Sequence, residues 1–325
     1  MKMDRRKFMA LAGASAAVLG MPNWSFAQSV AFDKLNIFVP AAAGGGWDGL
    51  ARSIEAAAKA EKLVNNFQLE NVGGAGGMVG LPKFVNERKG QGDWIIIGGS
   101  VMVGAGITNK SPVTMKDVTP LARMTEEAGV IVVPAAGKIK NWNELSSAIK
   151  ANPKAVSVGG GSAGGTDHIL LGLIIKALGG DPKNASYVAF AGGGQSVAAI
   201  LGAQVTAGIS GYSEFDEHIK SGKMIPVAVS GNVRIPGVNV PTLKELGVNV
   251  TAANWRGVFA APGINNDQKN KLVSFLTNLN NSASWKKTVE DRKWTNTFLS
   301  GNAFEEVIKK DISETEAVLK SLGLA

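Results

Sequence analysis

The sequence predicts a two-lobed α/β fold with a ligand cleft between the lobes, and two observations carry this prediction. Short runs rich in β-branched residues alternate with helical stretches along the chain, which indicates mainly parallel sheets flanked by helices. The 41 glycines among the 325 residues cluster in loops that directly follow the expected strands. Parallel α/β sheets bind ligands beyond the carboxyl ends of their strands, so these loops are expected to line the cleft.

The first 27 residues read as an export signal rather than as part of the fold. Arg5-Arg6 precede the apolar stretch Ala10–Met21, and we expect cleavage after Ala27. The arginine pair is typical of twin-arginine (Tat) signals; because Asp4 stands where Ser or Thr is usual, a Sec signal is the alternative. No later segment has the ~18 consecutive apolar residues that a membrane-spanning helix needs. Together with the export signal, this predicts a soluble exported protein.

In the first part of the chain we expect four strands and one helix. The helix spans Gly49–Lys62, because apolar residues such as Leu50 and Ile54 recur there at helical spacing. The strands are expected at Leu35–Val39, Phe67–Leu69, Trp94–Ile97 and Val130–Val133.

In the second part, strands and helices continue to alternate, and the tail from Asn265 onward is expected to be helical. One face of that tail carries Leu272, Phe275, Leu276 and Leu279. The further elements are expected to be strands Ala155–Val158, Ser186–Ala189, Val205–Ile209 and Ile225–Ser230, and helices His168–Leu178, Gln195–Leu201 and Ser213–Lys220.

The chain is expected to cross between the lobes twice, near Val130–Pro134 and near Thr251–Trp255. Lobe 1 would then contain residues 28–130 and 254–325, and lobe 2 residues 131–253.

Composition excludes several kinds of chemistry. The chain has no cysteine and two histidines, so thiolate metal sites, disulfides and cysteine nucleophiles are excluded, and we expect no metal and no cofactor. Without residues 1–27 the formal net charge falls from +8 to +5, a modest excess that suits small anions. No run of Lys and Arg is dense enough to predict nucleic-acid binding.

One interpretation of the glycine loops is a dinucleotide site. Residues Gly44–Gly49 satisfy the pattern G-x-G-x-x-G between a strand and a helix, and Glu70 follows at the distance of a ribose-binding acid. Against this, the charge of Asp48 would oppose a pyrophosphate at the same helix N-terminus, and Trp47 crowds the turn.

A second interpretation is a serine esterase of the α/β-hydrolase kind. Residues Gly160–Gly164 satisfy G-x-S-x-G with Ser162 as nucleophile, and Asp216 and His218 follow in the order that such enzymes use. Against this, Asp216 and His218 would share one helix face, whereas a triad acid and base normally lie on separate loops. We expect His218 to be a solvated surface residue and His168 to be a helix residue tied to neighbouring backbone.

The third interpretation, which we favour, is a binding site without catalysis. Each glycine loop leads into a helix N-terminus, where unpaired N–H groups and the helix dipole favour anions. Tyr212 and Ser213 follow a strand where a third cleft loop is expected, and Ser100 is a weaker candidate of the same kind. The candidate ligand-binding residues are Gly45, Gly46, Trp47, Asp48, Ser100, Ser162, Ala163, Gly164, Gly165, Thr166, Tyr212 and Ser213.

Several motifs together resemble one known family, and in order they cover nearly the whole chain beyond the export signal. They are Val39-Pro40 with Gly44–Asp48 and Arg52, Glu70–Gly77, Gly160–His168, Phe190–Gly194, Val227–Ser230 and Trp255–Pro262. This set resembles the substrate-binding component of tripartite tricarboxylate transporters, the Bug-type receptors.

The resemblance implies a periplasmic receptor with a periplasmic-binding-protein-like fold; nothing in the sequence indicates an obligate oligomer, so we expect a monomer. Such a receptor delivers a di- or tricarboxylate to the membrane permease subunits of an ion-driven transporter. The amides of the Gly44–Trp47 and Ser162–Thr166 loops would hold the first carboxylate, and the Gly-Gly-Trp-Asp version is similar to members associated with tricarboxylates.

Two further expectations concern the residues around the first loop. Asp48 is expected to cap the first helix or order water and to pair with Arg52 one turn later, rather than to contact an anion. The glycine-rich run 73–80 is expected to shape a turn without touching the ligand.

Overall fold

The computed structural model describes residues 30–325, and the export signal expected in residues 1–27 lies outside them. The described residues form ten strands and ten α-helices. The strands are β1 Phe32–Val39, β2 Val64–Asn71, β3 Trp94–Gly99, β4 Thr119–Pro134, β5 Ser157–Gly160, β6 Ser186–Ala189, β7 Ala207–Gly211, β8 Met224–Val229, β9 Ala253–Ala260 and β10 Thr295–Ser300. The helices are α1 Gly46–Ala60, α2 Gly80–Glu87, α3 Ser100–Thr108, α4 Trp142–Ala151, α5 Thr166–Ala177, α6 Gly193–Leu201, α7 Tyr212–Lys220, α8 Asn266–Asn281, α9 Ala283–Asp291 and α10 Asn302–Leu322.

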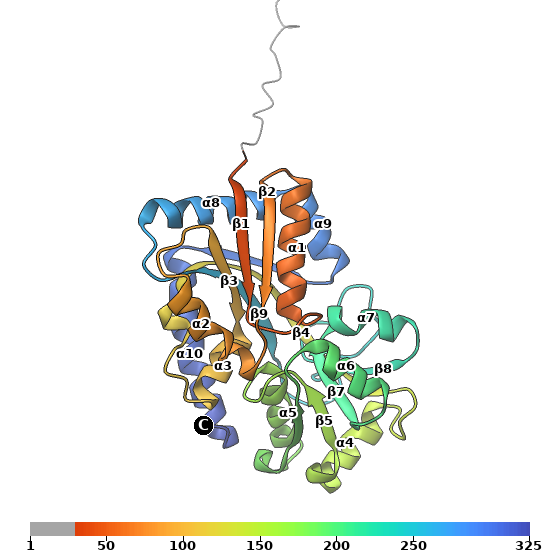
Figure 1. Ribbon diagram of the computed structural model, residues 1–325. Helices are drawn as coiled ribbons and strands as arrows, with labels where there is room; N and C mark the ends of the chain where they lie inside the picture. The colour runs from red at the N-terminus through yellow and green to blue at the C-terminus, as the bar shows by residue number, and fades with distance from the viewer. Residues whose placement is uncertain (1–29) are drawn as a thin grey trace, which may run out of the picture.

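The strands form two sheets that share the long strand β4. In the first sheet β1 pairs in parallel with β2 and β3, and β9 lies antiparallel between β3 and β4. In the second sheet β5 pairs in parallel with β6 and β7, while β7 and β8 pair antiparallel with β4. Figure 1 shows the first sheet with α1 and α8 in one half of the molecule, and α4 to α7 around the second sheet in the other half.

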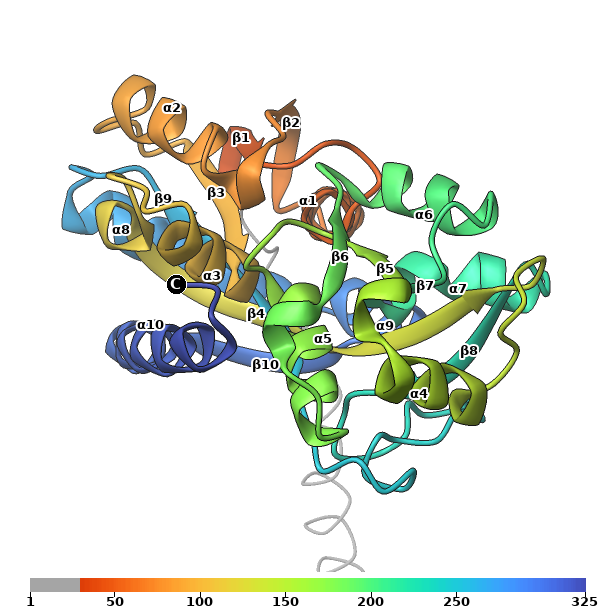
Figure 2. The same ribbon diagram turned by 90° about the horizontal axis from the view of Figure 1, so that it is seen from below.

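β4 is the strand on which both sheets are built, and it crosses the molecule (Figure 2). Its first part pairs with β9 and β10, and its last part, from Gly129 to Pro134, pairs with β7 and β8. The return strand β9 runs beside it over Thr119–Ala128. Because one strand leaves the first sheet and the other returns along the same path, the two are antiparallel neighbours.

Three sets of buried side chains pack around the two sheets. One gathers residues from Phe32 to Met124 and from Trp255 to Ile308, around the first sheet. The other two pack around the second sheet with residues between Val130 and Val250. The apolar core of the first sheet is therefore separate from those of the second, and the crossing strands β4 and β9 connect the two halves.

The α/β class is as the sequence predicts, but strand pairing is mixed rather than mainly parallel, because both crossing strands are antiparallel to their neighbours. β4 begins at Thr119, well before the expected strand Val130–Val133. The first half of β4 was not predicted because polar residues interrupt its apolar pattern. β9 is a full strand at the place where only a crossing was expected. β10 interrupts the tail that was expected to be helical throughout.

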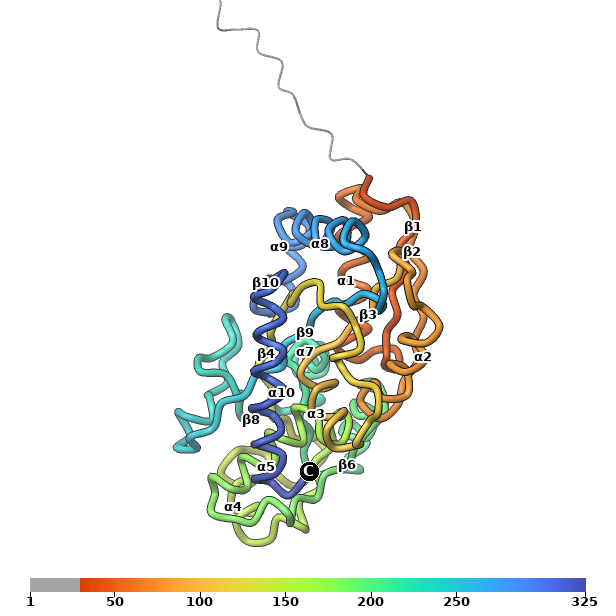
Figure 3. The backbone as a smooth tube through the Cα atoms, turned by 90° about the vertical axis from the view of Figure 1, so that its left-hand side faces the viewer, coloured from red at the N-terminus to blue at the C-terminus, as the bar shows by residue number. Residues whose placement is uncertain are grey.

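The C-terminal helices form for reasons visible in the sequence. Asn265 and Gln268 form a capping box at the start of α8, and the four apolar residues expected on its face are fully buried. α10 runs along the molecule beside α3 and reaches α5 near the C-terminus (Figure 3). Within residues 30–325, no helix is long and apolar enough to cross a membrane.

Replacing Phe304 by Ala is expected to lower the free energy of unfolding by about 3–5 kcal/mol. Phe304 is fully buried, and its ring centroid lies 5.7 Å from that of Trp255 and 5.5 Å from that of Phe259, so truncation leaves a cavity between α10 and β9. Urea denaturation measures the change. Val233→Ala, at a side chain that is 76% exposed, is the control and should change stability by less than about 0.5 kcal/mol. Equal effects of the two substitutions would contradict this packing.

Candidate functional site

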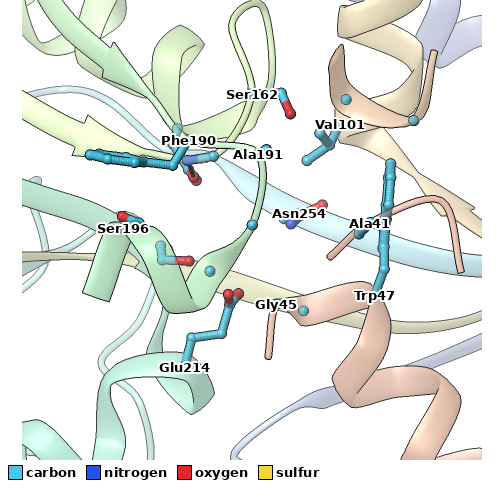
Figure 4. Close-up of a pocket in the computed structure, with 18 of the residues that line it drawn as sticks. Ala41, Gly45, Trp47, Val101, Ser162, Phe190, Ala191, Ser196, Glu214 and Asn254 are labelled. Carbon is cyan, nitrogen blue, oxygen red and sulfur yellow. Dashed lines mark hydrogen bonds between the residues drawn. The ribbon is translucent and has the colours of Figure 1, made fainter. Parts of the chain in front are cut away.

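A cavity of about 90 Å³ lies where the glycine loops of both halves meet. Figure 4 shows Trp47 and Val101 on one side, Phe190 and Ala191 on the other, and Asn254 between them. Its lining consists of Pro40, Ala41, Gly45, Gly46, Trp47, Gly74, Gly76, Gly77, Val101, Gly161, Ser162, Asp167, Phe190, Ala191, Gly192, Gly193, Ser196, Ser210, Glu214, Phe215, Asn254 and Arg256. The cavity thus combines backbone, aromatic and charged groups.

Three helices begin at or beside this cavity, and a glycine precedes each of them. Gly45, Gly165 and Gly192 are the N-caps of α1, α5 and α6, and none of the three helix starts has a side-chain cap. The first N–H groups of a helix have no intrahelical acceptor, so they remain available to an anionic group.

Asp48 accepts a hydrogen bond from the first glycine loop and does not line the cavity. Its carboxylate accepts hydrogen bonds from the Gly44 N–H at 3.0 Å, from Asn71 Nδ2 at 3.0 Å and from Arg52 Nε at 2.8 Å. Burial opposes ionisation of Asp48, but these donors outweigh it and hold its pKa below the usual range. The expected pair of Asp48 with Arg52 is confirmed.

The loops of the two halves touch through backbone. A Cβ atom on Gly193 would lie 2.9 Å from Gly45 Cα and 3.0 Å from the Gly44 carbonyl oxygen, and one on Gly104 would collide with the Gly164 carbonyl. Glycine is needed at Gly193 and Gly104 because main chain from one half lies directly against the other. A Cβ atom on Gly76 would collide with the Ala105 side chain and lie 3.2 Å from Ser162 Cβ in the other half.

A buried ionic cluster forms the deep wall of the cavity. Arg256, with 2% of its side chain exposed, donates to Glu127 Oε2 at 2.6 Å and to Glu214 Oε1 at 3.3 Å. Glu127 also accepts the Ser213 N–H at 2.7 Å. Burial opposes the charge of Arg256, but the two glutamates outweigh this and raise its pKa. Arg256 comes from β9, Glu127 from β4 and Glu214 from α7.

The pKa values of Glu214 and of a third acid, Asp167, are raised, which favours their neutral forms. Burial raises the pKa of Glu214 to about 7, with Arg256 opposing the shift and Glu127 adding to it. Burial likewise raises the pKa of Asp167 to about 6, against the hydrogen bond that the Gly161 N–H donates to it at 2.9 Å. Both carboxyl groups line the cavity.

Glycines also surround the ionic cluster. A Cβ atom on Gly46 would collide with the Arg256 guanidinium, and one on Gly211 would collide with the Glu127 carboxylate. The charged groups therefore pack on bare backbone.

The structure divides the candidate residues into two groups. Gly45, Gly46, Trp47 and Ser162 line the cavity, whereas Ala163, Gly164, Gly165 and Thr166 do not. Ala163 is exposed, and Thr166 donates to Asp167 Oδ1 at 3.4 Å.

Tyr212, Ser213 and Ser100 lie behind the lining. Tyr212 is buried, and burial together with Asp216 raises its pKa to about 12. Ser213 Oγ accepts from Trp294 Nε1 at 3.1 Å. Ser100 Oγ accepts from the Trp255 N–H at 3.2 Å, and its neighbour Val101 reaches the cavity instead.

The esterase interpretation finds no assembled triad in the described part of the chain. Asp216 pairs with Lys220 at 2.7 Å, and no hydrogen bond connects Ser162 to a histidine. His168 Nδ1 accepts the Gly164 N–H at 3.2 Å, and the ring stacks on Tyr187 at 4.3 Å, as expected of a helix residue tied to backbone. Burial lowers the pKa of His168.

The ion pairs of Glu70 argue against the dinucleotide interpretation. Glu70, the acid that a ribose would need, is paired with Lys83 at 2.7 Å and Arg88 at 3.1 Å. Among residues 30–325, no group of three His, Cys, Asp or Glu side chains is arranged to hold a metal ion.

Sequence reasoning missed the charged wall and part of the glycine lining. Gly74, Gly76 and Gly77 line the cavity, although their run was expected only to shape a turn. Arg256 stands in an otherwise apolar strand, and Glu127 stands at the start of a β-branched run. A charge inside a buried strand is a usable signal, because it requires a partner.

A family model described as "Tripartite tricarboxylate transporter family receptor" matches residues 50–324. Three solved structures resemble the chain over most of its length. The periplasmic binding protein BugD is 23% identical with a TM-score of 0.79, covering 90% of this chain and 98% of that one.

The other two are proteins of Rhodopseudomonas palustris. MatC, solved with bound malate, is 23% identical with a TM-score of 0.75, covering 88% of this chain and 98% of its own. A second protein, solved with adipate, is 20% identical with a TM-score of 0.79, and the match covers 89% of this chain and 97% of that one. The likenesses confirm the predicted two-lobed α/β fold class.

Replacing Arg256 by Met is expected to lower the free energy of unfolding by about 3–5 kcal/mol, because Glu127 would remain buried without its cation. Adding Glu127→Gln should recover part of the loss, since no unpaired carboxylate then remains. Urea denaturation of the three proteins measures this. The control is Lys309→Met, which removes a pair whose side chains are 69% and 71% exposed and should cost less than about 1 kcal/mol. A loss in Arg256→Met no larger than that would contradict the assignment.

The ligand-free protein is expected to become more stable as the pH is lowered from about 8 to about 5. The pKa of Glu214 is about 7 in the folded chain against an ordinary value of 4.5, so folding takes up a proton between these values. Stability is therefore lost as pH rises through this window. Thermal unfolding of wild type, Glu214→Gln and the exposed control Glu217→Gln measures the effect. Glu214→Gln should flatten the profile and Glu217→Gln should not; identical profiles for all three proteins would be inconsistent with it.

Proposed function

Because this chain belongs to the tripartite tricarboxylate transporter receptor family, a family of binding proteins and not of enzymes, we propose that it captures a small organic acid in the cavity and delivers it to a transporter. The resemblance inferred from the sequence motifs is thereby confirmed. The receptors of this family are periplasmic, and we propose that residues 1–27 direct export to that compartment, with Tat or Sec as the route.

The observation that carries this proposal is the set of glycine-capped helix starts around the cavity. α1, α5 and α6 start there with main-chain N–H groups that no side chain caps. A carboxylate accepts several such hydrogen bonds at once, and helix dipoles favour its charge. Binding of this kind needs no nucleophile or base.

The proposed ligand class is that of small di- or tricarboxylates. MatC was solved with malate and the second Rhodopseudomonas protein with adipate, both dicarboxylates. Trp47 lies on one side of the cavity and limits its width there (Figure 4).

We propose that binding closes two lobes, 28–130 with 254–325 and 131–253. Support comes from the separation of the buried core of the first sheet from the two cores of the second, and from the close approach of Gly45 and Gly193 across the cavity. The ligand would shift an open–closed equilibrium, and the closed monomer would dock on the permease subunits.

A thermal-shift screen of the chain without residues 1–27 tests the function. The panel contains succinate, malate, adipate, citrate, NAD and a hydrolysable ester. An acid at about a hundred times its dissociation constant should add about 2.7 kcal/mol of stability. A shift with a carboxylate supports the proposal. A shift only with NAD, or turnover of the ester, would overturn it.

Replacing Gly193 by Ala is expected to weaken carboxylate binding about tenfold or more, because the new Cβ would lie 2.7 Å from Glu214 Oε2 and 2.9 Å from Gly45 Cα and so keep the lobes apart. The matched control is Gly194→Ala, whose Cβ would meet nothing closer than the Ala43 carbonyl oxygen at 3.9 Å and should leave affinity unchanged. Isothermal titration calorimetry measures both. Equal affinities in the two variants would be incompatible with closure at this contact.

A further inference from the structure

The deep wall of the cavity carries more acids than cations. Three carboxyl groups, those of Glu127, Asp167 and Glu214, lie around Arg256, which is the one buried cation among residues 30–325. The charge of half-buried Arg292 also acts on Glu127. With both cations counted, the acids still outnumber the bases, so a further negative charge at this wall is opposed by the protein itself.

The charged groups that face Glu214 all belong to this wall. Arg256 on β9 donates to Glu214 Oε1 at 3.3 Å, while the charges of Glu127 on β4 and Asp167 on α5 disfavour ionised Glu214. The other elements beside α7 add no charge, because α6, β7 and β8 contain no ionisable side chain. Ser210 of β7 presents a hydroxyl to Glu214.

The same wall holds donors that the protein leaves unused. Arg256 Nε and Ser196 Oγ are buried in the lining, and neither has a hydrogen-bond partner among the described residues. A buried donor without an acceptor is costly, and an oxygen of a bound anion is an acceptor of the kind that both lack. These donors favour an anion at the wall, close to the three carboxyl groups.

Of the three acids, Glu214 has the weakest support for a negative charge. Glu127 accepts from Arg256 Nη1 at 2.6 Å and from the Ser213 N–H at 2.7 Å, and Asp167 accepts a backbone N–H at 2.9 Å. Glu214 has the longer contact of 3.3 Å with Arg256. When a ligand brings a further negative charge, Glu214 is therefore the acid that is most readily protonated.

We propose that capture of an organic anion in this cavity is coupled to the uptake of one proton, held chiefly on Glu214. This inference rests on the proposed receptor function and adds regulation of the same site by pH. The Glu214 carboxyl group points from α7 toward the space between Gly45 and α6 (Figure 4), with 13% of its side chain exposed. Once protonated, it becomes a hydrogen-bond donor for an oxygen of the bound anion.

The direction of the pH dependence follows from the state of Glu214 before the ligand arrives. Its pKa is about 7 because of burial, and a bound anion raises it further. Below this pH most of the free protein already carries the proton, so the affinity changes little. Above it, each bound anion requires a proton from solution, and the affinity falls by about tenfold per pH unit until the bound state also loses the proton.

Isothermal titration calorimetry with succinate, malate and adipate tests this, because these probes are fully ionised above pH 7. Affinity should fall about tenfold between about pH 7 and about pH 8.5. Titrations at about pH 8 in buffers of different ionisation enthalpy should show uptake of close to one proton per anion. Glu214→Gln, which is always neutral, should abolish the uptake and bind more tightly than wild type at the higher pH. Glu217→Gln, an exposed change on the same helix, should behave as wild type.

The outcomes separate this inference from the proposed function. If the anions bind equally well at both pH values without proton uptake, the inference is overturned while the receptor function stands. Undiminished uptake in Glu214→Gln, or weaker binding than wild type at the higher pH, would also overturn it, because Glu214 would then not be the group that is protonated. If no anion binds at either pH, the proposed function fails and the inference with it. Should Glu214→Gln not fold, the wild-type pH and buffer series still decide.

Discussion

The buried guanidinium of Arg256 is the group on which the rest of the site depends. It lies on β9, its nearest counterion Glu127 lies on β4, and these two strands are the connections between the sheets. A buried charge without a partner is very costly, so the ion pair fixes how the two strands lie against each other. Glu214 extends the same network to α7, which packs beside the strands of the second sheet. One cation thus ties together both halves of the molecule at their junction.

Several glycines around the cavity are required by the packing of this arrangement. Gly46 and Gly211 leave room for charged groups of the cluster, while Gly193 leaves room for the opposite loop. Each position has a different neighbour, and in each case that neighbour fills the space a side chain would need. Gly46 and Gly193 also line the cavity, so the bare backbone that leaves room for these neighbours borders the cavity as well.

The sequence predicted the alternation of elements well, because hydrophobic periodicity reports local burial. The expected strand Ser186–Ala189 has the bounds of β6, and the expected face of α8 is buried. The sequence did not predict the strands that form through long-range pairing, namely the polar first half of β4 and β10.

For the site, the glycine patterns predicted the Gly45–Trp47 turn and Ser162 in the lining. They did not predict Glu214 or Asn254, because single polar residues on unrelated elements carry no local signal. Arg256 and Glu127 could have been noticed, because each is a charge within a buried strand.

Because both sheets share β4, they complete their strand pairing at different times during folding. The strands β5 to β8 of the second sheet come from one continuous segment, so that sheet can form on β4 as soon as the segment exists. The first sheet needs β9 and β10, which follow much later in the sequence, to complete its pairing. Closing such long loops is slow, so the half with the N-terminal strand is the last to acquire its full set of partners. In such a chain β1, β2 and β3 can already pair with one another, and the pairing of β9 with β3 and β4 is the final link between the two halves to form.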